Sequence, residues 1–102
     1  MWWNMKTLNE VKKILLEHKK ELKEKYKVKK MGIFGSYARG EQTEKSDIDI
    51  MVEFYETPSL IEFIEMEYYL SDLLGIKVDL ITKNSIKNPY LKESIEEDLL
   101  YV

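Results

Sequence analysis

Hydrophobic residues in the first part of the chain recur with helical spacing. Leu8, Val11, Leu15 and Leu22 lie three, four or seven positions apart, which predicts one amphipathic helix over residues 7–25. His18 falls on the same apolar stripe. A single histidine on such a stripe is expected to pack against the core rather than to bind a ligand.

The spacing then changes to that of strands. Residues 28–34 form a short apolar run that ends at Gly35-Ser36, which predicts a strand followed by a turn. Residues 37–45 are predicted as a loop, or as a short helical turn and then a loop. Residues 47–54 alternate, so side chains two positions apart share one face of a second strand. One face carries Ile48, Ile50, Val52 and Phe54, and the other carries Asp47, Asp49, Met51 and Glu53.

The second half predicts a helix, a strand and another helix. Thr57 and Pro58 suit the N-cap and first position of a helix that runs to about residue 74, and Gly75 suits its end. Residues 77–82 predict a third strand. Asn88-Pro89 predicts the start of a last helix, which we extend to about residue 100.

The predicted element order is α-β-β-α-β-α, without an internal repeat or a linker. This order indicates one α/β (α+β) domain over residues 1–102, with a small mixed sheet flanked by helices. Several tyrosines could stack on a nucleotide base, but packing is the expected role of each: Tyr37, Tyr55, Tyr68, Tyr69 and Tyr90.

Composition narrows the class of protein further. The chain has 102 residues, no cysteine and no apolar run near the roughly 20 residues that span a membrane. The N-terminal segment is too short for a signal peptide. We therefore expect a cytoplasmic protein without disulfides or thiolate metal sites. Trp2 and Trp3 could pack onto the domain or contact a partner.

The net charge of −3 conceals an asymmetry. Residues 6–30 hold ten lysines against four glutamates, whereas residues 31–102 hold six basic against fifteen acidic residues. The lysine-rich segment is either a solvated helix face or a surface that meets an acidic partner or nucleotide phosphates. Nucleic acid is not the expected partner, because the net charge is negative and no aromatic stacking pattern accompanies the lysines.

Two aspartates one residue apart in a strand suggest a metal site. Asp47 and Asp49 project from the same face, where unpaired carboxylates would repel each other. A divalent cation such as Mg²⁺ removes that repulsion and prefers oxygen ligands. Asp79 lies in the third strand, and it would converge with the pair if that strand is the neighbour of residues 47–54. Three such carboxylates suit phosphoryl or nucleotidyl transfer with two metal ions.

Gly35-Ser36 supplies features that a phosphate site requires. Glycine allows close approach of the backbone to a phosphate, and the turn can present N–H groups beside the serine hydroxyl. Arg39 could neutralise phosphate charge. A strand end with phosphate donors, followed by a carboxylate pair, is typical of a nucleoside triphosphate site.

The stretch "GSYARGEQTEKSDID" is Gly-Ser, ten residues, then Asp-x-Asp. It resembles the signature of the polymerase-β-like nucleotidyltransferase superfamily. With "KVDLIT" and "NPYLKESIEEDLLYV", residues 28–102 resemble the minimal nucleotidyltransferases of the MntA antitoxin type. The resemblance implies the nucleotidyltransferase fold. It also implies that Asp47, Asp49 and Asp79 bind two Mg²⁺ ions, with Asp79 also acting as base.

The resemblance further implies a reaction and a partner. Gly35 and Ser36 would hold the β- and γ-phosphates of ATP, and Arg39 would assist them. AMP would be transferred to a tyrosine of a HEPN-domain ribonuclease toxin, which would be silenced. The chain has little room for a separate acceptor domain, so another chain should supply the acceptor, although a homo-oligomer could also build the site.

Two alternatives stay open from the sequence. The chain could be a non-catalytic antitoxin that blocks its partner sterically. It could also transfer a nucleotide to a hydroxyl of a small molecule. An intact set of three carboxylates disfavours the first alternative, and the absence of an acceptor domain disfavours the second.

Overall fold

A four-stranded mixed sheet forms the centre of the protein, whose computed structural model describes residues 6–102. Trp2 and Trp3 lie outside the described residues. The strand order is β3-β2-β1-β4. β1 pairs antiparallel with β2 and β4, whereas β2 and β3 are parallel. The strands are β1 Val28–Phe34, β2 Ile48–Phe54, β3 Val78–Thr82 and β4 Leu100–Tyr101.

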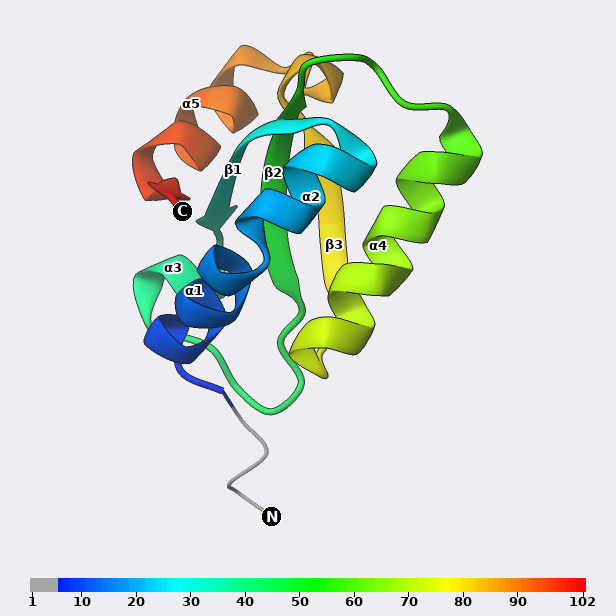
Figure 1. Ribbon diagram of the computed structural model, residues 1–102. Coiled ribbons are helices and arrows are strands. Elements are labelled where there is room, and N and C mark those ends of the chain that lie inside the picture. Colours follow the sequence, from blue (N-terminus) through cyan, green and yellow to red (C-terminus); the bar gives the residue numbers. More distant parts are fainter. Residues whose placement is uncertain (1–5) are drawn as a thin grey trace.

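Helices cover the sheet on both sides. The helices are α1 Leu8–Glu17, α2 Lys19–Tyr26, α3 Ser36–Arg39, α4 Leu60–Leu74 and α5 Pro89–Asp98, with a 3₁₀ turn η2 at Lys83–Ser85. In Figure 1, α1, α2 and α4 lie in front of the sheet, and α5 lies beside β1. This arrangement is the small mixed sheet flanked by helices that the sequence predicted. No helix within residues 6–102 is long and apolar enough to cross a membrane.

The predicted first helix is in fact two helices, and the expectation of one continuous helix was wrong. The backbone of His18 leaves the helical region, with φ −105° and ψ 7°, and separates α1 from α2. Its Nδ1 lies 2.9 Å from the carbonyl oxygen of Ile14. The half-buried imidazole is therefore held locally by the backbone of α1. Val11 and Leu22, one on each helix, are both fully buried.

The start of α4 differs from the prediction by two residues. Its N-cap is Ser59 rather than Thr57, because Ser59 and Glu62 form a capping box. The Ser59 hydroxyl accepts from the Glu62 amide at 3.2 Å, and the Glu62 carboxylate accepts from the Ser59 amide at 3.1 Å. Thr57 has leucine three positions later and cannot form this reciprocal pair. Gly75 ends the helix with φ +69°, as predicted.

The C-terminal segment also differs from the prediction. Asn88 caps α5 as expected, but the helix ends at Asp98, and the chain then forms β4. The side chain of Leu99 packs over Gly32, where a Cβ would lie about 3.0 Å from the Leu99 Cγ. A side chain on residue 32 would therefore clash with this segment. A two-residue strand leaves no periodicity in the sequence, so the prediction missed it.

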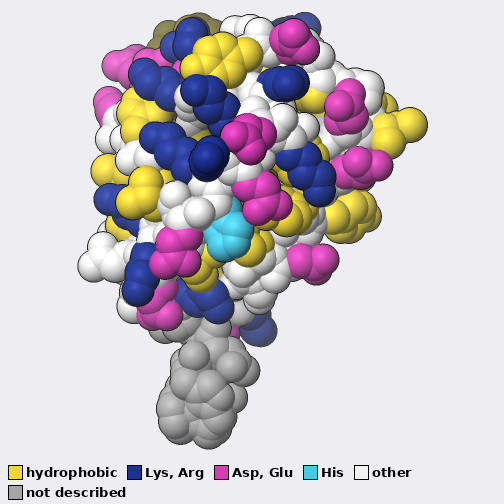
Figure 2. Space-filling model, viewed as in Figure 1, with side chains coloured by type: hydrophobic (Ala, Val, Ile, Leu, Met, Phe, Trp, Pro, Cys, Tyr) yellow, Lys and Arg dark blue, Asp and Glu magenta, His cyan; other side chains and the backbone are white. Residues whose placement is uncertain are grey.

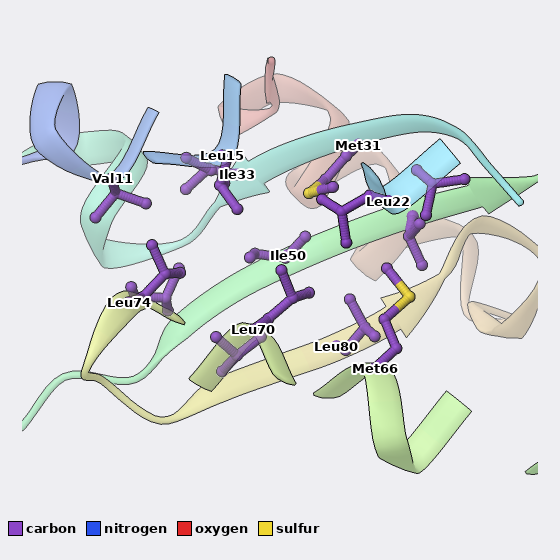
Figure 3. Close-up of a cluster of buried hydrophobic side chains, with 14 of the residues drawn as sticks. Val11, Leu15, Leu22, Met31, Ile33, Ile50, Met66, Leu70, Leu74 and Leu80 are labelled. Carbon is purple, nitrogen blue, oxygen red and sulfur yellow. The ribbon is translucent and has the colours of Figure 1, made fainter. Parts of the chain in front are cut away.

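The core lies between the sheet and α1, α2 and α4, and Figure 3 shows aliphatic side chains from these elements meeting there. Ile48, Ile50 and Val52 of β2 are fully buried, as the alternation predicted. Met51 points to the opposite face and is also buried, at 3% exposure. It pairs with Gly32, beneath the C-terminal segment. The second face of the sheet is therefore covered over its middle and more open at Asp49.

Lysine side chains gather on the outer surface of the helices α1 and α2, which cover one face of the sheet. Figure 2 shows them over α2 and the neighbouring part of the sheet, interleaved with hydrophobic side chains. α2 itself is strongly polar, and only Leu22 and Tyr26 of its eight residues are buried. The remaining face of this short helix is therefore exposed and rich in lysine.

Candidate active site

Strand register brings two of the predicted carboxylates side by side. Asp49 in β2 and Asp79 in β3 are direct partners in the parallel pair. Asp79 is exposed and Asp49 is half-buried. The sequence predicted this convergence on the condition that the second and third strands are neighbours, and the strand order β3-β2 meets that condition.

The glycine of the Gly-Ser turn lies directly against Asp49. Phe34, the last residue of β1, pairs with Asp49, so the next residue, Gly35, passes over the carboxylate. A Cβ on Gly35 would overlap Oδ2 of Asp49 and lie 3.1 Å from its Cγ. Gly35 also has φ +77°, a region that side chains disfavour. Both space and conformation therefore require glycine here.

Electrostatics at this end of the sheet are unfavourable without a cation. Burial raises the pKa of Asp49, and the neighbouring charges of Asp79 and Asp47 raise it further, while Arg39 acts in the opposite direction. Asp47 precedes β2 and is exposed, so its influence on Asp49 is the smaller of the two. Because Asp49 is partly buried, solvent screens its repulsion with Asp79 and Asp47 only weakly.

The three aspartates have the oxygen ligands that Mg²⁺ prefers, but their side chains do not form a complete metal site. Within residues 6–102, no three acidic or histidine side chains lie close enough together to hold a metal ion as they stand. Asp49 and Asp79 are adjacent, whereas Asp47 lies immediately before the start of β2. Carboxylate oxygens are the ligands that Mg²⁺ prefers, and a bound cation would oppose the burial and the like charges that raise the pKa of Asp49.

The turn after β1 forms a single helical turn, α3, which begins at Ser36. Gly35 is its N-cap and provides no side-chain hydrogen bond to the first amides. Those amides are therefore available to an acceptor such as a phosphate oxygen. Tyr37 is 1% exposed and belongs to the core, and burial raises the pKa of its phenol. Its side chain anchors the turn to the fold.

Arg39 lies close enough to influence Asp49 but is engaged by two other carboxylates. Its Nε lies 2.7 Å from Oε1 of Glu41, and its Nη1 lies 2.6 Å from Oδ2 of Asp98. These hydrogen bonds raise the pKa of Arg39. Sequence reasoning missed Asp98 as part of this site, because it lies 59 positions from Arg39 and no local pattern links them.

The tyrosines divide into two groups. Tyr37 packs in the core, and Tyr69 packs against Tyr26 with ring centroids 5.8 Å apart, as predicted. The hydroxyl of Tyr69 donates to Glu21 at 2.8 Å, and burial with this bond raises its pKa to about 12. The packing role was wrong for three others, which are 59–83% exposed: Tyr55, Tyr68 and Tyr90.

Comparison with protein families and with proteins of known sequence shows which family the chain resembles. The family described as "Nucleotidyltransferase domain" matches residues 15–102. A relative from Methanocaldococcus jannaschii, named "Putative protein adenylyltransferase MJ0128", is 74% identical over 98 residues, which cover 96% of this chain and 100% of that protein. "Protein adenylyltransferase MntA" of Thermococcus cleftensis is 52% identical over 98 residues, covering 96% and 98% of the two chains.

Solved structures share the fold. A minimal nucleotidyltransferase superposes with a TM-score of 0.76 at 28% identity, covering 93% of this chain and 95% of that one. A toxin–antitoxin complex with AMP-PNP gives 0.67 at 28% identity, with 92% and 70% coverage. A complex of tri-AMPylated Shewanella oneidensis HEPN toxin with MNT antitoxin gives 0.58 at 24% identity, with 92% and 66% coverage, and this likeness shows the fold alone.

Proposed function

The chain belongs to the nucleotidyltransferase family and, within it, to the MntA-like protein adenylyltransferases, and from this we propose that it transfers AMP from ATP to a tyrosine of a HEPN-domain toxin. The chain would thereby act as the antitoxin of that partner. The observation that carries the proposal is the pairing of Asp49 with Asp79 beside Gly35, which joins a carboxylate pair to a phosphate-binding turn.

Three carboxylates would hold two Mg²⁺ ions: Asp47, Asp49 and Asp79. The bound cations would neutralise charge on the triphosphate and polarise the reacting oxygens. Support comes from the pKa of Asp49, which burial and the two neighbouring aspartates raise. A divalent cation would offset that repulsion.

The Gly-Ser turn would orient the nucleotide. Gly35 allows the backbone to approach the β- and γ-phosphates closely, and the Ser36 hydroxyl and the uncapped amides of α3 would donate to their oxygens. Tyr37, buried in the core, would keep this turn fixed as the charge on the phosphates changes. Arg39 would add positive charge at the rim, with its orientation held by Asp98 and Glu41.

In the transfer step, the tyrosine oxygen of the partner would attack the α-phosphorus of ATP. The carboxylate of Asp79 would accept the proton of the phenol as the new P–O bond forms. The bond from the α-phosphorus to the bridging oxygen breaks, and pyrophosphate leaves with that oxygen. Asp79 suits this role because it is the more exposed member of the pair and can reach an acceptor that arrives from solvent.

The acceptor is expected to come from another chain. Within residues 6–102, the described elements form the sheet and its covering helices, and the carboxylate end of the sheet faces outward. A protein acceptor can supply its own shape around this open end. A small hydroxyl compound would have fewer contacts to hold it in position.

The decisive experiment is intact mass spectrometry of a HEPN-domain partner protein, after incubation with the chain, ATP and Mg²⁺. We expect the partner to gain whole AMP units, and peptide mapping should place them on tyrosine. The Asp47→Asn/Asp49→Asn variant is the control and should add none. A stable complex that neutralises the toxin without any mass gain would favour steric inhibition instead.

A second experiment separates the small-molecule alternative. A panel of small hydroxyl compounds with labelled ATP should give no labelled product above background. Efficient labelling of one of them, with no mass gain on the partner protein, would replace the protein acceptor by a small one.

A further inference from the structure

A groove at the N-terminal half of β1 combines an apolar floor with a basic rim. It has a volume of about 190 Å³ and lies between β1 and the helices α1 and α2. Its floor includes Leu15, Val28 and Met31, which are 1–6% exposed. Tyr55 lines the groove with 59% of its side chain exposed. The groove therefore offers apolar contact area that the fold itself does not fill.

Four lysines surround the groove: Lys19, Lys23, Lys29 and Lys30. All four are exposed. In the described part of the chain, none of them has an acidic partner within 4.0 Å. Lys23 lies over the ring of Tyr55, with its Nζ 5.7 Å from the ring centroid. The rim therefore carries positive charge that no carboxylate of the described residues balances at ion-pair distance.

The backbone beside the groove can accept another strand. β4 pairs only with Gly32 and Ile33, and the amide of Val102 donates to the carbonyl oxygen of Met31 at 3.0 Å. Among residues 6–102, no strand pairs with Val28–Lys30 on this side of β1. An unpaired strand edge is a template for an extended segment of another chain.

We propose that this groove binds an extended acidic segment of the acceptor protein, with its backbone along the open edge of β1, its carboxylates on the lysines and an apolar side chain on the floor. The proposal rests on the proposed function, because it assigns a docking site for the same protein substrate. Charge complementarity selects the occupant, since an acidic segment can pair with all four lysines.

The position of the groove relative to the carboxylate site explains how docking could select a protein acceptor. Val28 and Phe34 are the two ends of β1, and the groove adjoins the first whereas the carboxylate site adjoins the second. Six residue steps of a strand span about 20 Å. A macromolecule can bridge that distance and a single amino acid cannot, so docking would recruit proteins in preference to small hydroxyl compounds.

Binding to the chain alone tests the groove directly. The probe is a fluorescein-labelled peptide of alternating glutamate and valine, followed by fluorescence anisotropy at low salt. The Lys19→Glu/Lys23→Glu variant should bind it at least roughly tenfold more weakly. The matched control is Lys13→Glu/Lys20→Glu, which makes the same change in net charge on exposed positions of α1 and α2 outside the groove. It should bind as the wild type does.

Three results would overturn the proposal. Equal loss in both variants would show non-specific attraction of charge. Tighter binding of a single-stranded RNA of equal charge, lost in the groove variant, would make the occupant a nucleic acid. A concentration-dependent dimer in which amide signals of residues 28–31 shift would make it a second copy of this chain.

Transfer kinetics then connect the groove to catalysis. With the HEPN-domain partner as acceptor, the groove variant should show a KM raised about tenfold and an unchanged kcat, because the carboxylate site is intact. An unchanged KM would contradict the docking role. Absence of any AMP transfer by the wild type would instead count against the proposed function, and the peptide titration would still judge the groove.

Discussion

The carboxylate end of the sheet and the lysine groove both gather like charges, but they hold them in different ways. Asp49 and Asp79 are fixed by strand register, and Asp49 is half-buried beneath Gly35. The lysines of the groove extend on long side chains from α2 and β1 into solvent. Repulsion is therefore built into the fold at the first region, whereas the lysine side chains at the second can move apart.

The contrast indicates the kind of ligand that each region suits. A rigid, partly desolvated pair of carboxylates is organised before a small, hard cation arrives, and phosphate oxygens can complete the coordination. Exposed ammonium groups on long side chains can adapt to a flexible acidic segment, and they add little to folding stability. Chemistry is thus expected at the rigid region and recruitment at the adaptable one. Four predictions test this division.

Removal of the central carboxylate should have the largest effect. Asp49→Asn should lower the rate of AMP transfer by on the order of 10²–10³-fold or more, because it removes charge from the site proposed to bind the metal ions and the triphosphate. Steady-state assays with purified partner and ATP would measure the loss. The control is Asp72→Asn, an exposed aspartate of α4 away from the site, which should retain activity. Similar activity in both variants would remove Asp49 from the chemistry.

Replacement of the turn glycine should have the next largest effect. Gly35→Ala adds a methyl group that overlaps the Asp49 carboxylate and strains a backbone with φ +77°. We expect a loss of about 2–4 kcal/mol in the free energy of unfolding together with loss of activity.

Gly40→Ala is the matched control for that substitution. Gly40 has φ +71°, but no atom lies within 4 Å of the position of its Cβ. It should therefore lose only about 1 kcal/mol through backbone strain. Urea titrations of both variants would measure the difference. Equal losses would mean that the contact with Asp49 contributes nothing.

A smaller effect is expected in the pH dependence of the free energy of unfolding, which tests the repulsion at Asp49. The folded-state pKa of Asp49 is raised above its usual value of 3.8, so the folded protein binds this proton more tightly than the unfolded chain does. Stability from this group is present below pH 3.8 and is lost as the pH rises through the raised folded-state value.

Asp49→Asn removes this titration, and thermal unfolding in metal-free buffer would measure the result. The variant should match the wild type at the lowest pH and become the more stable of the two as the pH rises. Mg²⁺ should narrow the gap at neutral pH by stabilising the wild type. A stability difference that does not change with pH would contradict the electrostatic origin of the repulsion.

The smallest effect is expected at the groove. Lys19→Glu/Lys23→Glu should change the free energy of unfolding by no more than about 0.5 kcal/mol. Lys19 begins α2 and Lys23 lies in its last turn, so acidic residues there act in opposite senses on the helix dipole. Chemical denaturation would measure the change. A large loss would show that these lysines support the fold, and their effect on docking would then be indirect.

Local pattern predicted most elements because their causes are local. The alternation of Ile48, Ile50 and Val52 placed β2, and Asn88 and Gly75 placed helix ends through their own hydrogen bonds and backbone conformation. Errors arose where a competing local contact was stronger, as at the Ser59–Glu62 capping box. Helix spacing alone also concealed the break at His18, since Val11 and Leu22 remain buried on either side of it.

The sequence by itself determined the fold class and singled out the residues that we propose carry the chemistry: Gly35, Ser36, Asp47, Asp49 and Asp79. Only the tertiary structure decided how they meet. The parallel register of β2 and β3 puts Asp49 beside Asp79, and the end of β1 brings Gly35 onto Asp49. The pairing of Arg39 with Asp98 and the groove beside β1 likewise join segments far apart in the chain. Such contacts depend on the packing of whole elements, which no short stretch of sequence encodes.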